Sequence, residues 1–175
     1  SLRRQRQMCI RDRFYPVKAH NYKYELNKDM NFAAAHYIGH ESAGKCQNVH
    51  GHTYFVNITI VGDNLQDNGF LVNFQELKQI AHGKYDHTLM NDFDWNGEQP
   101  STEVVAKTIY KAVREALTEY DNKPHVLQVI VRETPTSYVT YSEQLPDEYD
   151  EEQTQHAYVD KESDFNNKHI DWSEF

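Results

Sequence analysis

The sequence predicts one α+β domain in which two helices cover one face of a four-stranded antiparallel sheet. Two stretches rich in aromatic and β-branched residues come first, two stretches with helical periodicity follow, and two further extended stretches come last. The predicted element order is therefore ββααββ. A chain of 175 residues can form one substantial core but hardly two. Because a four-stranded sheet has two open edges, we also expect copies of the chain to associate.

The first two strands are predicted over residues 22–36 and 52–61. Alternation in the first places four residues on one face: Met30, Phe32, Ala34 and His36. The second is rich in Tyr, Phe, Val, Ile and Thr, the residues that favour strands. Asp, Asn and Gly residues at 63–69 predict a turn that ends it.

Two helices are predicted between the strand pairs. The first opens at Asn73, which resembles a capping box with Glu76, and Gly83 can end it. Its apolar positions are Phe74, Leu77, Ile80 and Ala81. The second follows Pro100, with Ser101 or Thr102 as its N-cap. Its apolar stripe follows the 3.6-residue period and comprises Val105, Ile109, Ala112, Val113, Ala116 and Leu117.

The last two strands are predicted over residues 126–133 and 137–142. Alternation in the first places Leu127, Val129 and Val131 in the core, on the same face as Glu133. A carboxylate at the end of such an apolar row is costly unless it is paired or binds something. Two parallel N–H donors on an amidine-like ligand edge would suit it.

Composition divides the chain into three segments. Residues 1–13 hold five of its seven arginines, and we interpret them as a basic segment that is foreign to the domain or disordered. Residues 14–145 form the predicted domain. Residues 146–175 hold ten acidic side chains and read as a flexible tail. The net charge of −9, with basic residues concentrated in one short segment, gives no indication of a nucleic-acid partner.

The scarcity of long apolar runs and of cysteines predicts the cellular setting. No run of 18 apolar residues is present and residues 1–30 hold no apolar signal-peptide core, so we expect no membrane association. Only Cys9 and Cys46 are present, far apart in the sequence, which argues against a disulfide scaffold. We therefore expect a cytoplasmic protein.

Three histidines form the most informative pattern. His50 and His52 point the same way if the backbone is extended, and Gly51 between them permits a close approach. His36, at the end of the preceding strand, can supply a third imidazole. Three neutral imidazoles suit a catalytic Zn²⁺ with one open position. A lone His-x-His pair is also common on exposed strands, and His40 is a surface loop residue that could be mistaken for a ligand.

Two further groups could move protons. Cys46 lies close enough to the histidine pair to face a metal ion without binding it, and its thiolate could accept a proton. The alternative role for Cys46 is that of a small buried apolar residue. Asp86 and His87 could form a relay pair, although ordinary turn chemistry explains this dipeptide almost as well.

Taken together, these motifs resemble a known enzyme family. The segments FAAAH, CxxxHGH, DH, PSTE and ETPTS, spread over residues 20–142, resemble the 6-pyruvoyltetrahydropterin and 6-carboxytetrahydropterin synthases. The resemblance implies a tunnelling fold (T-fold), Zn²⁺ on His36, His50 and His52, and subunits joined edge to edge as trimers or homohexamers with active sites between them. It also implies that Cys46 accepts the proton and that Asp86 and His87 form the relay.

The same resemblance implies a substrate and a reaction. Glu133 would anchor a pterin ring, in a pocket to which Thr102, Glu103 and Thr134 contribute. The substrate would be 7,8-dihydroneopterin triphosphate, and the three-residue gap between Cys46 and His50 resembles the carboxy branch. That branch is a lyase releasing acetaldehyde and triphosphate, and it feeds queuosine and other deazapurines. The alternatives are the pyruvoyl branch, a metal-free aldolase-type pterin enzyme, and an inactive zinc- or pterin-binding module.

Overall fold

A computed structural model describes residues 20–143, which fall within the predicted domain. The predictions for residues 1–13 and 146–175 lie outside the described residues. Strands β1 (Tyr24–His36) and β2 (His50–Gly62) form a long antiparallel pair in continuous register, from Tyr24 opposite Gly62 to His36 opposite His50. This pair confirms the first two predicted strands.

The sheet has five strands in the order β3-β1-β2-β4-β5. Strands β4 (His125–Thr134) and β5 (Ser137–Tyr141) extend it in antiparallel fashion, as predicted. The expected four-stranded, fully antiparallel sheet is wrong in one respect, because β3 (Thr88–Leu89) pairs in parallel with Ala34 and Ala35 of β1. Two residues are too few to show any periodicity, and backbone hydrogen bonding just before them sets their place: His87 N donates to Ala33 O at 2.7 Å.

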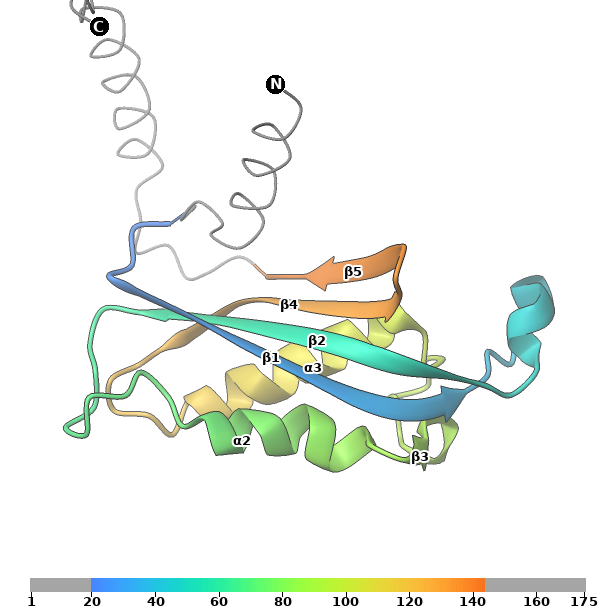
Figure 1. Ribbon diagram of the computed structural model, residues 1–175, viewed down its shortest axis with the longest axis horizontal. Coiled ribbons are helices and arrows are strands. Elements are labelled where there is room, and N and C mark those ends of the chain that lie inside the picture. Colours follow the sequence, from blue (N-terminus) through green and yellow to red (C-terminus); the bar gives the residue numbers. More distant parts are fainter. Residues whose placement is uncertain (1–19, 144–175) are drawn as a thin grey trace, which may run out of the picture. The chain divides into compact units, whose positions relative to one another are not determined.

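The helices cover one face of the sheet, as Figure 1 shows. Helix α3 (Thr102–Leu117) begins at the predicted N-cap, since Ser101 Oγ accepts a hydrogen bond from Val104 N. Four of the six predicted stripe residues pack into the core, namely Val105, Ile109, Val113 and Leu117, joined by Ala106 and Tyr110, while the predicted Ala112 and Ala116 are only half-buried. Its amphipathic pattern is therefore confirmed as the face that contacts the sheet.

The first predicted helix is divided. A short α2 (Phe74–Lys78) is followed by a π-helical turn, η2 (Gln79–Gly83). Asn73 caps it as predicted, but the capping box does not form, because Glu76 accepts a hydrogen bond from Tyr120 Oη at 2.6 Å instead. Leu77 and Ala81 are buried as expected. Phe74 is 49% exposed, since it lies in the first turn, where the Lys28 ammonium group lies over its ring.

A β-bulge changes which residues of β4 enter the core. Thr59 of β2 pairs with Gln128, whereas the next residue, Ile60, pairs with Val126, so Leu127 is the extra residue. Val126 is therefore buried and Leu127 only half-buried, contrary to the prediction. Beyond the bulge the alternation holds, because Val129 and Val131 are fully buried.

Candidate metal centre and catalytic pocket

The register of β1 and β2 brings the three histidines together. His36 and His50 are direct partners across the ladder, and His52 lies two residues further along the same face of β2. The ring centroid of His36 lies 4.6 Å from that of His50 and 5.4 Å from that of His52. The ring centroids of His50 and His52 are 5.0 Å apart. The structure thus brings together the three residues predicted as metal ligands.

Main-chain carbonyls fix two of the imidazole rings. His36 Nδ1 donates to Pro100 O at 2.7 Å, and His50 Nδ1 donates to Asn48 O at 2.8 Å. A carbonyl oxygen can only accept, so both Nδ1 atoms carry their protons and each Nε2 presents a lone pair in the neutral ring. These two Nε2 atoms lie 3.1 Å apart. Two lone pairs facing each other at this distance are unfavourable unless a cation lies between them.

The third imidazole is oriented toward the same point. His52 Nε2 is buried and makes no hydrogen bond within residues 20–143, although it lies 3.4 Å from Glu133 Oε1. Burial lowers the pKa of His52, and the neighbouring His36 and His50 lower it further against the opposing effect of Glu133. A lowered pKa favours the neutral imidazole, the form in which a histidine can bind a metal ion.

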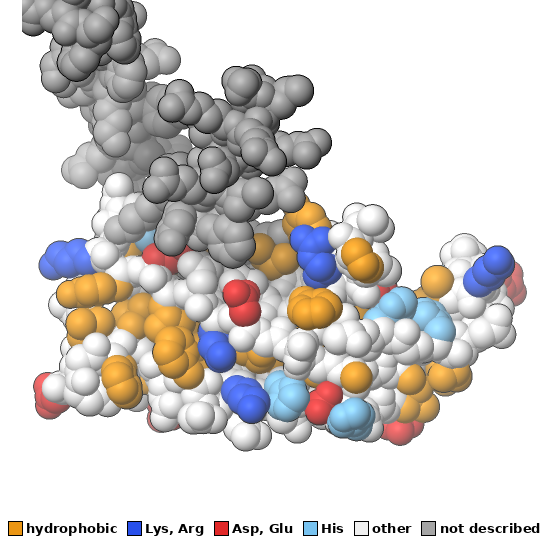
Figure 2. Space-filling model, in the orientation of Figure 1, with side chains coloured by type: hydrophobic (Ala, Val, Ile, Leu, Met, Phe, Trp, Pro, Cys, Tyr) orange, Lys and Arg blue, Asp and Glu red, His pale blue; other side chains and the backbone are white. Residues whose placement is uncertain are grey.

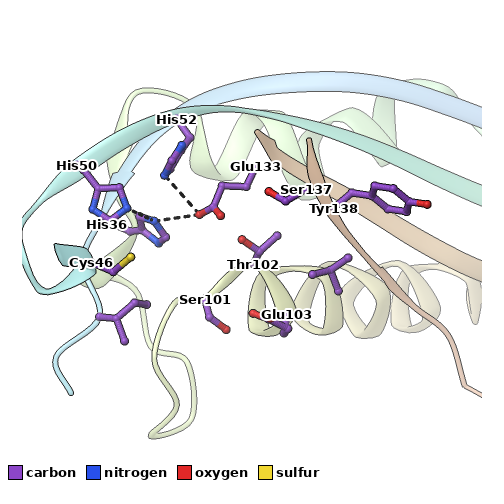
Figure 3. A pocket seen from close by; sticks show the side chains of 12 residues that line it. His36, Cys46, His50, His52, Ser101, Thr102, Glu103, Glu133, Ser137 and Tyr138 are labelled. Atoms are coloured by element: carbon purple, nitrogen blue, oxygen red, sulfur yellow. Dashed lines mark hydrogen bonds and ion pairs between the residues drawn. The ribbon is translucent and has the colours of Figure 1, made fainter. Parts of the chain in front are cut away.

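Glu133 completes a group of four potential ligands. Its Oε1 lies 3.3 Å from His36 Nε2, and one ligand atom from each of the four residues lies within 4.8 Å of all the others. Figure 3 shows the Glu133 carboxylate directed toward the imidazoles from the end of β4. This His–His–His–Glu group could hold a metal ion, and its donors fit the site that the sequence predicts.

The group lies at one end of a pocket of about 400 Å³. Predicted residues that line it are His36, Cys46, His50, His52, Thr102, Glu103 and Glu133. Cys46 is exposed rather than buried, which excludes its alternative role as a small core residue. Thr134 does not line the pocket; its Oγ1 is 2.6 Å from Ser137 Oγ, and it organises the turn between β4 and β5.

Sequence reasoning missed two tyrosines at the site. Tyr138 lines the pocket from β5, where it follows directly on the turn after Glu133. Tyr54 is fully buried next to His52, and the centroids of the two rings are 5.6 Å apart. Burial and the charge of Glu133 raise the pKa of Tyr54, which keeps its hydroxyl protonated. The position of Tyr54, two residues after His52 on the same strand face, was the available signal.

Asp86 and His87 do not line the metal pocket. Asp86 Oδ1 accepts a hydrogen bond from Ala33 N at 2.9 Å, and this bond lowers the pKa of Asp86. Its Oδ2 lies 3.6 Å from His87 Nε2 and 3.7 Å from Nε2 of His82, whose i,i+4 spacing to Asp86 was the missed signal. The side chain of His87 is 84% exposed on a backbone with φ of 58°. Figure 2 shows histidine side chains at separate places on one face of the molecule.

Within one copy of the chain, the predicted relay pair of Asp86 and His87 lies outside the metal pocket. Neither Asp86 nor His87 lines the pocket that holds Cys46. His87 instead lines a shallow depression with Gly51 and Thr53, and His52 borders both this depression and the metal pocket. His40, as expected, is an exposed loop residue that bonds Ser42. No helix in the described part of the chain is both long and apolar enough to cross a bilayer.

Fold and site together indicate an enzyme of the T-fold class with a pocket whose His–His–His–Glu group could hold a metal ion, and comparisons with known proteins agree on the fold. Residues 25–144 match the family described as 6-pyruvoyl tetrahydropterin synthase. The solved structure of the 6-pyruvoyl tetrahydropterin synthase of Caenorhabditis elegans superposes with a TM-score of 0.57 at 21% identity, over 69% of this chain and 96% of that one. This likeness supports the tunnelling fold.

Curated relatives are closer in sequence. The chain is 58% identical over 132 residues to the 6-carboxy-5,6,7,8-tetrahydropterin synthase of Bacillus subtilis, covering 73% of this chain and 90% of that protein. It is 30% identical to the protein of the same name from Synechocystis, covering 66% of this chain and 91% of the relative. The chain belongs to the 6-pyruvoyl tetrahydropterin synthase family.

Proposed function

We propose that this protein is a zinc-dependent 6-carboxy-5,6,7,8-tetrahydropterin synthase, a carbon–carbon lyase. It would convert 7,8-dihydroneopterin triphosphate to 6-carboxy-5,6,7,8-tetrahydropterin and release acetaldehyde and triphosphate, a step toward queuosine or other deazapurines. The observation that carries this proposal is the 58% identity to the Bacillus subtilis protein of that name over 90% of its length. The His–His–His–Glu group beside an exposed cysteine supports it independently.

Zinc is the metal we assign to His36, His50 and His52, because three neutral nitrogen donors with one position left for a ligand are typical of catalytic zinc. When bound there, zinc would act as a Lewis acid toward a hydroxyl oxygen of the substrate side chain. The carbonyl partners of the Nδ1 atoms hold the His36 and His50 rings in the required orientation.

The remaining residues of the pocket bind the substrate and move protons. The Cys46 thiolate would accept a proton from the substrate side chain. Glu133 would accept the parallel N–H donors of the pterin edge, with Thr102 and Glu103 at the pocket wall, while Thr134 would act through the turn that it organises after Glu133. His87, oriented by Asp86, would exchange the second proton. Because that pair lies outside the pocket of its own chain, it would come from a neighbouring subunit of a trimer or hexamer.

Product analysis tests the proposal. Purified protein with measured zinc content is incubated with 7,8-dihydroneopterin triphosphate, and the products are identified by mass spectrometry. We expect 6-carboxytetrahydropterin and acetaldehyde. A 6-pyruvoyl product would assign the chain to the sister branch, for which the 34% identity to a Drosophila melanogaster 6-pyruvoyl tetrahydrobiopterin synthase is the favouring observation. Bound zinc without any product would favour a non-catalytic module, and turnover in metal-free protein would exclude the zinc mechanism.

A further inference from the structure

The segment between β1 and β2, residues 37–49, carries Cys46 but contributes little to the core. It contains the 3-10 segment η1 (Glu41–Gln47), in which no residue is buried. Figure 1 shows η1 projecting beyond the end of the sheet. Burial of apolar side chains therefore does not hold Cys46 at the pocket, and its position depends on hydrogen bonds.

One anchor of this segment is the side chain of Asn91. Its Oδ1 accepts a hydrogen bond from Tyr37 N at 2.9 Å, and its Nδ2 donates to Tyr37 O at 2.9 Å. The amide thus replaces a strand partner at the residue directly after β1. Asn91 follows β3 by two residues, so it continues the edge that β3 forms along β1. The amide offers the donor and the acceptor on two adjacent atoms, as pairing with both Tyr37 N and Tyr37 O requires.

The second anchor is Gln99. Its Oε1 accepts a hydrogen bond from Gly39 N at 2.8 Å. Gln99 directly precedes Pro100, whose carbonyl orients His36. The same short stretch of chain therefore fixes both a metal ligand and the cysteine segment.

We propose that Asn91 and Gln99 are positioning residues that hold Cys46 at the metal pocket. They fix the residues on either side of Ile38, and Ile38 N donates to Cys46 O at 2.8 Å, which ties the cysteine to the anchored strand end. This inference rests on the proposed function, in which the Cys46 thiolate accepts a proton. A base displaced by about 1 Å loses on the order of 100-fold in rate.

Kinetics of matched variants test the inference. We expect Asn91→Leu and Gln99→Leu to lower kcat about 10- to 100-fold, with KM for 7,8-dihydroneopterin triphosphate and zinc content changed less than about twofold. Gln99→Glu keeps the acceptor for Gly39 N and should restore kcat to within about threefold. If Asn91→Leu does not fold, the Gln99 pair carries the test.

A loop at the other end of the sheet supplies the matched control. Asn122 Nδ2 donates to Asn64 O at 3.0 Å and to Leu71 O at 2.9 Å, so it too holds a loop through main-chain carbonyls. Asn122→Leu should lower the melting temperature as much as the anchor variants while kcat stays normal. An equal loss of kcat in Asn122→Leu, or normal kcat in folded Gln99→Leu, overturns the inference.

Thiol reactivity gives a readout that needs no turnover. In a Cys9→Ser background, the rate of Cys46 alkylation by iodoacetamide at pH 7 is measured with and without zinc. A nearby cation favours the thiolate, so zinc should accelerate alkylation in the parent and in Gln99→Glu, and this acceleration should disappear in both Leu variants. Equal acceleration in all variants overturns the positioning role of Asn91 and Gln99 but leaves the proposed role of Cys46 standing. No acceleration in the parent overturns the proposed role of Cys46 beside the metal.

Discussion

The hydrogen bonds from His36 Nδ1 to Pro100 O and from His50 Nδ1 to Asn48 O determine what the pocket can bind. They place a proton on Nδ1 of each ring, so that in the neutral ring each Nε2 offers its lone pair, and these two nitrogens lie 3.1 Å apart. Glu133 adds a carboxylate at 3.3 Å from His36 Nε2. The same carboxylate is thus placed either to bind the metal or to accept N–H donors from a substrate lying against the metal.

Replacing Glu133 by Gln distinguishes these two roles. If Glu133 anchors the pterin, Glu133→Gln should keep stoichiometric zinc and raise KM about 10- to 100-fold, because a hydrogen bond to a charged group contributes roughly 1.5–3 kcal/mol. Zinc content by atomic absorption and steady-state kinetics give the two quantities. Loss of zinc from Glu133→Gln at unchanged fold would instead make the carboxylate a metal ligand.

The lowered pKa of His52 predicts how the zinc-free protein responds to pH. The unfolded chain protonates this imidazole near its ordinary pKa of 6.5, while the folded chain resists protonation until lower pH. Below pH 6.5 the unfolded state therefore binds more protons, and stability falls as the pH falls, by at most about 1.4 kcal/mol per pH unit.

Urea unfolding of zinc-free protein between pH 8 and 5 measures this effect. His52→Gln removes the titrating group and should lose less stability over the same range than the parent. Identical pH profiles for the two proteins would contradict the argument, and so would a parent that gains stability as the pH falls below 6.5.

At the scale of the element, predictability followed the length of the pattern. The alternation of β1, the β-favouring composition of β2 and the helical period of α3 were read correctly, and the register of β1 on β2 then placed His36 beside His50 and His52. Strand β3 was missed because two residues carry no period, and its position depends on tertiary hydrogen bonds at Ala33. Tyr138 was missed at the site for a similar reason, since only the pairing of β5 with β4 brings it to the pocket.

Strict alternation predicted Leu127 in the core, whereas the bulge in β4 buries Val126 instead, and substitutions at these two residues test the difference. Val126 is 2% exposed, whereas Leu127 is only half-buried. Val126→Thr places a hydroxyl in the core and should cost about 1–3 kcal/mol, while Leu127→Thr should cost less than half as much. Urea unfolding midpoints compare the two variants. A larger loss for Leu127→Thr would restore the regular alternation that the sequence suggests.

At the scale of the whole molecule, the sheet leaves backbone available for assembly. Within residues 20–143, β3 covers β1 only at Ala34 and Ala35, and no strand pairs with the outer side of β5. Open edges of this kind favour pairing with another copy. Within one chain, the exposed His87 lies outside the pocket that holds Cys46. Assembly could bring the two groups together, because a neighbouring copy could supply Asp86 and His87.

Complementation between two inactive variants tests this arrangement. Cys46→Ala keeps the relay pair, and His87→Ala keeps the cysteine pocket, so each alone should lose most activity. If active sites form between subunits, equal mixing during refolding creates sites with both groups intact. Random assembly should then restore about a quarter of parental activity, since each half of a site comes from the right variant half the time.

Two controls make the complementation result decisive. Sedimentation velocity establishes that both variants form the same oligomer as the parent, which we expect to be a trimer or hexamer. The double variant, with Cys46→Ala and His87→Ala in one chain, is mixed equally with parental protein. If sites form between subunits, activity should fall to about a quarter, below the half that dilution alone would leave, because both halves of an intact site must come from parental chains. Persistent inactivity of the two single variants in a shared oligomer would show that Cys46 and His87 of the same chain must act together.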